Sequence, residues 1–118
     1  MTVKECYEAF DGNYDEVVSR LRTDERIVKF LLKVLQDGSY KLLCDSVASG
    51  NAGEAFRAAH TLKGVCLNLA ITRLACSSSD LTEALRNSSV IEDSVQPLLD
   101  RVKQDYDLTV SSILQLDK

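Results

Sequence analysis

The sequence predicts an all-α protein, and three observations carry this prediction. Apolar residues recur at spacings of three and four along most of the 118-residue chain, as on one face of an amphipathic helix. No segment shows the period-two alternation of a half-buried strand. Asp11-Gly12 and Asp37-Gly38 separate helical stretches and do not join two alternating ones. Amphipathic helices with short polar loops, at a length that suits one domain over residues 1–118, imply an antiparallel helical bundle.

Two short helices are predicted at the N-terminus, over residues 3–10 and 14–22, on either side of an Asp11-Gly12-Asn13 turn. Their apolar side consists of Tyr7, Phe10, Tyr14, Val17, Val18 and Leu21. We expect residues 1–22 to form an arm that covers a bundle made by residues 24–116.

The next two helices are predicted on either side of a polar break. Asp24 is the expected N-cap of a helix that runs to about Gln36. Asp37-Gly38-Ser39 stops it, and a second helix follows over residues 39–49. The residues expected to face the core are Ile27, Leu31, Val34 and Leu35 in the first helix, and Tyr40, Leu43, Cys44 and Val47 in the second.

Three longer helices complete the chain. Asn51 can cap a helix over residues 52–70, and residues 72–86 form the next, which contains an unusually polar run of three serines. The last helix starts near Ser94, with Pro97 tolerated in its first turn. Its apolar stripe is Val95, Leu98, Leu99, Val102, Tyr106, Thr109, Val110 and Ile113.

Composition excludes several classes of function. The net charge of −4 and the pI of about 4.9 argue against a general binder of nucleic acids or anionic membranes, which needs a basic surface. No apolar run exceeds three residues, and the first residues contain no hydrophobic signal segment. We therefore expect a cytoplasmic, monomeric protein whose partner is another protein.

The four cysteines predict neither a metal site nor a disulfide framework. Cys6, Cys44, Cys66 and Cys76 include no Cys-x-x-Cys pair, and the chain has one His. A chain with a full core needs no disulfides, and most of these cysteines occupy apolar positions of helical patterns. We expect buried, reduced thiols and no bound metal.

The helix over residues 52–70 carries the candidate chemistry. Its core side is expected to be Ala55, Ala59, Leu62, Cys66 and Leu69. At about 100° per residue, His60 points about 140° away from the centre of this arc, which places the imidazole in solvent.

Unusual residues surround His60 on the helix surface. Lys63 lies one turn on, where it can pair with an anion formed on the ring. Gly64 costs about 1 kcal/mol relative to Ala in a helix, so we interpret it as room for an approaching group. Arg57 and Asn68 are polar neighbours, and Phe56 and Leu67 are expected to expose apolar surface beside the site.

Charge is distributed unevenly around this helix. The segment 55–79 contains Arg57, Lys63 and Arg73 and no acidic residue, so it carries +3, and the net charge of −4 leaves −7 on the rest. A local basic face on an acidic protein favours an acidic docking partner.

The helix contains a run that resembles the signature of the histidine-containing phosphotransfer (HPt) domain of multistep phosphorelays: Ala-His-Thr-Leu-Lys-Gly from Ala59 to Gly64, followed by Asn68-Leu69. The resemblance covers nearly the whole chain. It implies a four-helix bundle with additional short N-terminal helices. It also implies an exposed histidine that carries a phosphoryl group between aspartates of receiver domains.

Residue by residue, the resemblance makes His60 the phospho-acceptor, Lys63 the cation assisting the phosphoryl oxygens and Gly64 the residue that leaves space. Asn68 and Arg57 become neighbours of the phosphoryl group, and Phe56 and Leu67 become docking contacts. The chain departs from the family where Ala70 stands in place of a common Gly, and where Val65 and Cys66 stand in place of smaller residues. On the following helix, Ser78 and Thr82 are the candidates for a contact to phosphate.

The expected mechanism is attack by neutral His60 on a receiver's aspartyl phosphate, through a loose in-line transition state and reversibly. The partners are receiver domains of response regulators or hybrid histidine kinases. They would hold the Mg²⁺ that the reaction needs, because this chain has no carboxylate cluster near His60. We expect a phosphoryl carrier without kinase activity of its own.

Two alternatives belong to other classes of protein. The first is a helical adaptor in which His60 is never phosphorylated. The second is a hydrolase that uses Cys66 or Cys76 with His60. It is the weaker one, because Cys66 lies about 120° from the histidine on the same helix and no triad spacing can be built.

Overall fold

The computed structural model describes residues 1–117, and these residues form seven α-helices and no strand. The helices are α1 (Val3–Ala9), α2 (Tyr14–Leu21), α3 (Asp24–Val34), α4 (Ser39–Ala48), α5 (Ala52–Asn68), α6 (Thr72–Leu85) and α7 (Val95–Leu114). The all-α prediction is therefore confirmed, and the predicted helices are all present with ends shifted by one or two residues.

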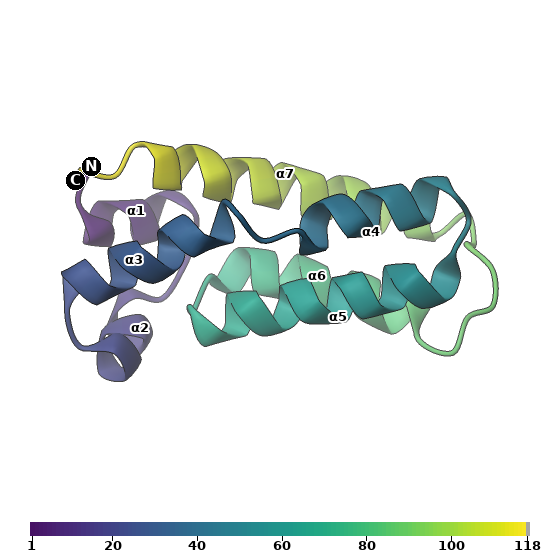
Figure 1. The fold of residues 1–118 in the computed structure, drawn as a ribbon, viewed down its shortest axis with the longest axis horizontal. Helices are drawn as coiled ribbons and strands as arrows, with labels where there is room; N and C mark the ends of the chain where they lie inside the picture. The colour runs from purple at the N-terminus through teal and green to yellow at the C-terminus, as the bar shows by residue number, and fades with distance from the viewer. Residues whose placement is uncertain (118) are drawn as a thin grey trace.

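One half of the molecule is built on α5. This helix packs against α4 on one side and α6 on the other, and α6 packs against α7 (Figure 1). Tyr40 of α4 stacks on Tyr106 of α7, with parallel ring planes and centroids 3.7 Å apart. The stack joins the first and last helices of this group.

The other half contains the three short N-terminal helices. Figure 1 shows α1 beside the C-terminal end of α7, α3 beside α1, and α2 below α3. α3 ends at Val34, and α4 continues from Ser39 in the same general direction, so the polar break predicted at Asp37-Gly38 lies between two helices. Both described ends of the chain lie in this half.

Side chains cap the starts of four helices. The side chains of Thr2, Asn13, Thr23 and Asn51 each accept a hydrogen bond from a backbone N–H in the first turn that follows, which satisfies a donor without a helical partner. The predicted N-cap Asp24 was wrong by one residue, because the Thr23 hydroxyl caps α3. Asn51 caps α5 as predicted.

The core side predicted for α5 is confirmed. Ala55, Ala59, Leu62, Cys66 and Leu69 are all buried. Ala58 is buried as well, because α5 has a packed neighbour on two sides and needs a wider apolar face than a single interface would.

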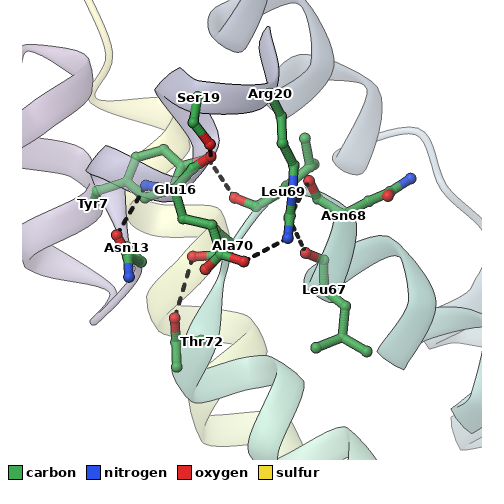
Figure 2. A network of polar contacts seen from close by, with 10 residues as sticks. All are labelled: Tyr7, Asn13, Glu16, Ser19, Arg20, Leu67, Asn68, Leu69, Ala70 and Thr72. Carbon is green, nitrogen blue, oxygen red and sulfur yellow. Dashed lines mark hydrogen bonds and ion pairs between the residues drawn. The ribbon is translucent and has the colours of Figure 1, made fainter.

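The C-terminal end of α5 is held by the N-terminal helices (Figure 2). The Arg20 guanidinium on α2 donates to the carbonyls of Leu67 and Asn68, at 2.6 and 3.1 Å. The Tyr7 hydroxyl donates to the Leu69 carbonyl at 2.7 Å, and the backbone N–H of Asn13 donates to the next carbonyl along the chain at 2.9 Å. These contacts bring donors to the carbonyls at and just beyond the end of the helix, where N–H partners within the helix run out.

Two residues at this end have unusual backbone surroundings. Ala70 has a φ of +54°, in the left-handed region, and terminates α5 with the paired backbone bonds of a Schellman motif. Gly12 lies against the same turn. A Cβ at Gly12 would lie 2.6 Å from ring atoms of Tyr7 and Phe10 and 2.9 Å from the Ala70 carbonyl oxygen. Only glycine fits there.

Within residues 1–117, no helix has both the length and the apolar composition to cross a membrane.

Candidate functional site

The middle of α5 presents His60 to solvent, as the sequence predicts. His60 and Gly64 are exposed, one turn apart on the same side of the helix. A Cβ added at Gly64 would meet no atom within 4 Å. No packing requirement therefore explains this glycine, and the space beside the imidazole is open.

His60 lies in a shallow hollow of about 370 Å³, lined by Phe56, Arg57, His60, Thr61 and Arg86. The rings of Phe56 and His60 have centroids 6.0 Å apart. The Arg86 guanidinium lies over the Phe56 ring, 5.2 Å from its centroid. Phe56 is therefore half-buried, and the expectation that it exposes apolar surface was wrong to that extent.

Sequence reasoning missed two residues at this site, Glu83 in the last turn of α6 and Arg86 directly after that helix. The Arg86 guanidinium donates two hydrogen bonds to the Glu83 carboxylate, at 2.9 and 3.1 Å. It lowers the pKa of Glu83, and Lys63 and His60 act in the same direction. A Glu–Arg pair three apart at the end of the helix that packs on α5 was the available signal. This signal could be interpreted only with knowledge of the register between α5 and α6.

The basic face predicted from sequence is largely neutralised in three dimensions. Arg57 forms an ion pair with Glu54 on its own helix. Arg73 pairs with Asp105, which is buried, and with Asp11. All three acidic partners lie outside the segment 55–79. The net charge of the segment therefore overstated the positive charge on this face.

Lys63 is the remaining cation of that segment, and in the part of the chain that the structure describes it has no ion pair. It lines a second hollow of about 230 Å³ between α5, α6 and α2, together with Leu67, Cys76 and Glu16. Leu67 is 52% exposed, so the apolar surface predicted for it is present.

Asn68 lies away from His60. It occupies the last turn of α5, about 12 Å along the helix axis from the histidine. It lines a third hollow with Phe30 and Lys33 of α3. The structure therefore does not bring Asn68 and His60 together.

Ser78 and Thr82 do not face the site. Both are fully buried in α6, and the Thr82 hydroxyl donates to the Ser78 carbonyl at 2.7 Å. Neither can reach a group attached to the exposed ring, so their selection as phosphate contacts was wrong. Periodicity did not reveal this because serine and threonine are compatible with either face of a helix.

The thiols differ in exposure. Cys6 and Cys66 are buried, Cys44 is half-buried and Cys76 is exposed, so the expectation of buried thiols was wrong for Cys76. None of the four forms a disulfide within residues 1–117. Burial raises the pKa of Cys66 to about 12, which makes it a poor nucleophile. Among residues 1–117 there is no cluster of three His, Cys, Asp or Glu side chains suited to a metal ion.

Comparisons with protein-family models, with curated proteins and with solved structures gave no match to this chain.

Proposed function

We propose that this chain is a histidine phosphotransfer protein of a phosphorelay and that His60 is its phospho-acceptor. The observation that carries the proposal is an exposed imidazole with Lys63 and Gly64 one turn on and open space beside it. A residue that only packed or solubilised the helix would need neither the glycine nor the space.

The arrangement of helices supports the same proposal. The helices α4, α5, α6 and α7 pack in succession, with the tyrosine stack between the first and the last. We interpret them as the four-helix bundle that the resemblance implies, with α1–α3 as the additional N-terminal helices; α3 thereby joins the predicted arm of residues 1–22, although it was expected to belong to the bundle of residues 24–116. His60 then lies near the middle of one bundle helix, on its outer side.

The proposed chemistry is one reversible displacement at phosphorus. A ring nitrogen of neutral His60 attacks the phosphorus of a receiver's aspartyl phosphate, forming a P–N bond. The P–O bond to the aspartate breaks, and the carboxylate leaves with the electron pair while the other ring nitrogen keeps its proton. Positioning and electrostatics do most of the work in such a transfer, and Lys63, one turn from His60 and without an ion pair within residues 1–117, supplies a positive charge free to meet the phosphoryl oxygens.

The proposed partners are receiver domains of response regulators or hybrid histidine kinases, met in the cytoplasm. Their acidic residues would hold Mg²⁺ during transfer, and this chain would act as a carrier without autonomous kinase activity. Leu67 gives such a partner exposed apolar surface next to Lys63, which suits docking around the site.

Intact-mass measurement after incubation with a phosphorylated receiver domain and Mg²⁺ tests this function. We expect one added phosphoryl group that is lost in acid and absent from His60→Gln. Because His60 is exposed, the variant should keep the parent's circular dichroism and melting temperature.

The adaptor alternative predicts a different result from the same experiment. It predicts no transfer from any of several receivers, together with unchanged binding by the His60→Gln variant. That outcome would overturn the proposed function.

A further inference from the structure

The hollow around His60 brings together two guanidinium groups from different helices. Arg57 comes from α5 itself and Arg86 from the end of α6. Guanidinium groups bind phosphate through paired N–H donors, so both are chemically suited to a phosphoryl group on the imidazole.

Arg86 is the better placed of the two to act as a separate arm. Its guanidinium lies over Phe56, and Phe56 is next to His60. It reaches the hollow from across the helix interface, so it can contact the side of a phosphoryl group that faces α6. Lys63 approaches from the other hollow, on the α2 side.

In the unphosphorylated chain, Arg86 is occupied by Glu83. The two hydrogen bonds between them are of normal length, and the side chains are 45% and 57% exposed. Ion pairs with this exposure contribute little to stability. A phosphoryl group with two negative charges is a stronger acceptor than one carboxylate, so exchange of partners would cost little.

Resting on the proposed function, we propose that Arg86, at the C-cap of α6, is a phosphoryl-binding residue and that Glu83 is the counter-ion it gives up. When His60 is phosphorylated, the Arg86 guanidinium leaves the Glu83 carboxylate and binds the phosphoryl oxygens. Glu83 thereby competes with the phosphoryl group for Arg86, and the strength of this competition adjusts how readily the chain holds or returns the phosphoryl group.

The equilibrium constant for transfer between a phosphorylated receiver and this chain measures the effect directly. When both proteins are free in solution, this equilibrium constant depends on the relative stability of their phosphorylated and unphosphorylated forms. It does not depend on the affinity of the complex between the two proteins. Intact mass of both proteins in one mixture gives it. We expect Arg86→Gln to lower the constant about three- to tenfold and Glu83→Gln to raise it about two- to fivefold.

The chain offers a matched control pair. Arg101 and Asp80 form an ion pair 2.6 Å long with similar exposure, and Arg101 does not line the hollow. Arg101→Gln and Asp80→Asn make the same changes of charge and should leave the constant unchanged. On phosphorylation, the Nε–H resonance of Arg86 should move and that of Arg101 should not.

Three results separate the possible failures. If the parent chain takes up no phosphoryl group, the proposed function fails, and the role of Arg86 fails with it. If transfer occurs and Arg86→Gln leaves the constant unchanged, only the role of Arg86 fails. If Glu83→Gln raises the constant equally in the Arg86→Gln background, Glu83 acts through space and the exchange of partners is overturned.

Discussion

The C-terminal end and the middle of α5 differ in how closely other residues pack against them. At the C-terminal end, side chains and backbone groups of the N-terminal helices bind successive carbonyls, and Gly12 packs so closely that no Cβ fits. In the middle, His60 is exposed and Gly64 borders open space. Glycine allows close packing at position 12, and at position 64 it leaves room for an approaching group. A side chain that contacts another protein needs a rigid support and an accessible position. The fixed end of α5 supplies the first, and its exposed middle supplies the second.

The first prediction addresses the closed end and carries the largest expected change in stability. Gly12→Ala places a methyl group against the rings of Tyr7 and Phe10, both fully buried. We expect the free energy of unfolding to fall by about 2–3 kcal/mol, measured by urea denaturation. A value within the error of the parent would show that the arm is not held as closely as the structure indicates.

The second prediction removes the guanidinium that binds the end of α5. Arg20→Ala leaves two carbonyls without this donor, and we expect a loss of about 1–2 kcal/mol. Hydrogen exchange should become faster over residues 66–71 and stay unchanged over 56–62. Faster exchange in both regions would contradict the independence of the C-terminal end and the middle of α5. Arg101→Ala, which removes a surface ion pair, is the control.

The third prediction addresses the open middle. Gly64→Ala should raise the free energy of unfolding by up to about 1 kcal/mol, because Ala is the better helix former and the added methyl meets no atom. Under the proposed function, the same methyl should slow phosphoryl transfer about tenfold or more by obstructing the partner. A stabilised variant with the parent's transfer rate would contradict the role assigned to this glycine.

The fourth prediction concerns Ala70 and has the smallest expected change in stability. Ala70→Gly relieves a left-handed backbone conformation, worth about 1 kcal/mol, but removes a buried methyl worth about 0.8 kcal/mol. We expect stability within about 0.5 kcal/mol of the parent by thermal unfolding. A large loss would mean that the methyl matters more to packing than to backbone strain.

The helices and their core faces were predictable because each depends on residues close together in sequence. The arc on α5 and the cap at Asn51 are examples, since local periodicity and one side-chain oxygen determine them. The exposure of His60 followed from the same periodicity.

Contacts between distant segments were not predictable in this way. Arg73 pairs with residues 62 and 32 positions away, and this neutralises one of the three cations of the expected basic face. The position of Arg86 over Phe56 depends on the register between α5 and α6. The burial of Ser78 and Thr82 depends on rotation about the helix axis, which small polar residues do not report.

Locating the phosphoryl group within the chain tests the central claim most directly. After transfer from a phosphorylated receiver, the protein is digested at neutral pH and its peptides are sequenced by electron-transfer fragmentation, which preserves the P–N bond. We predict a single modified residue, His60. A phosphoryl group on any other side chain, or its undiminished uptake by His60→Gln, would contradict the account.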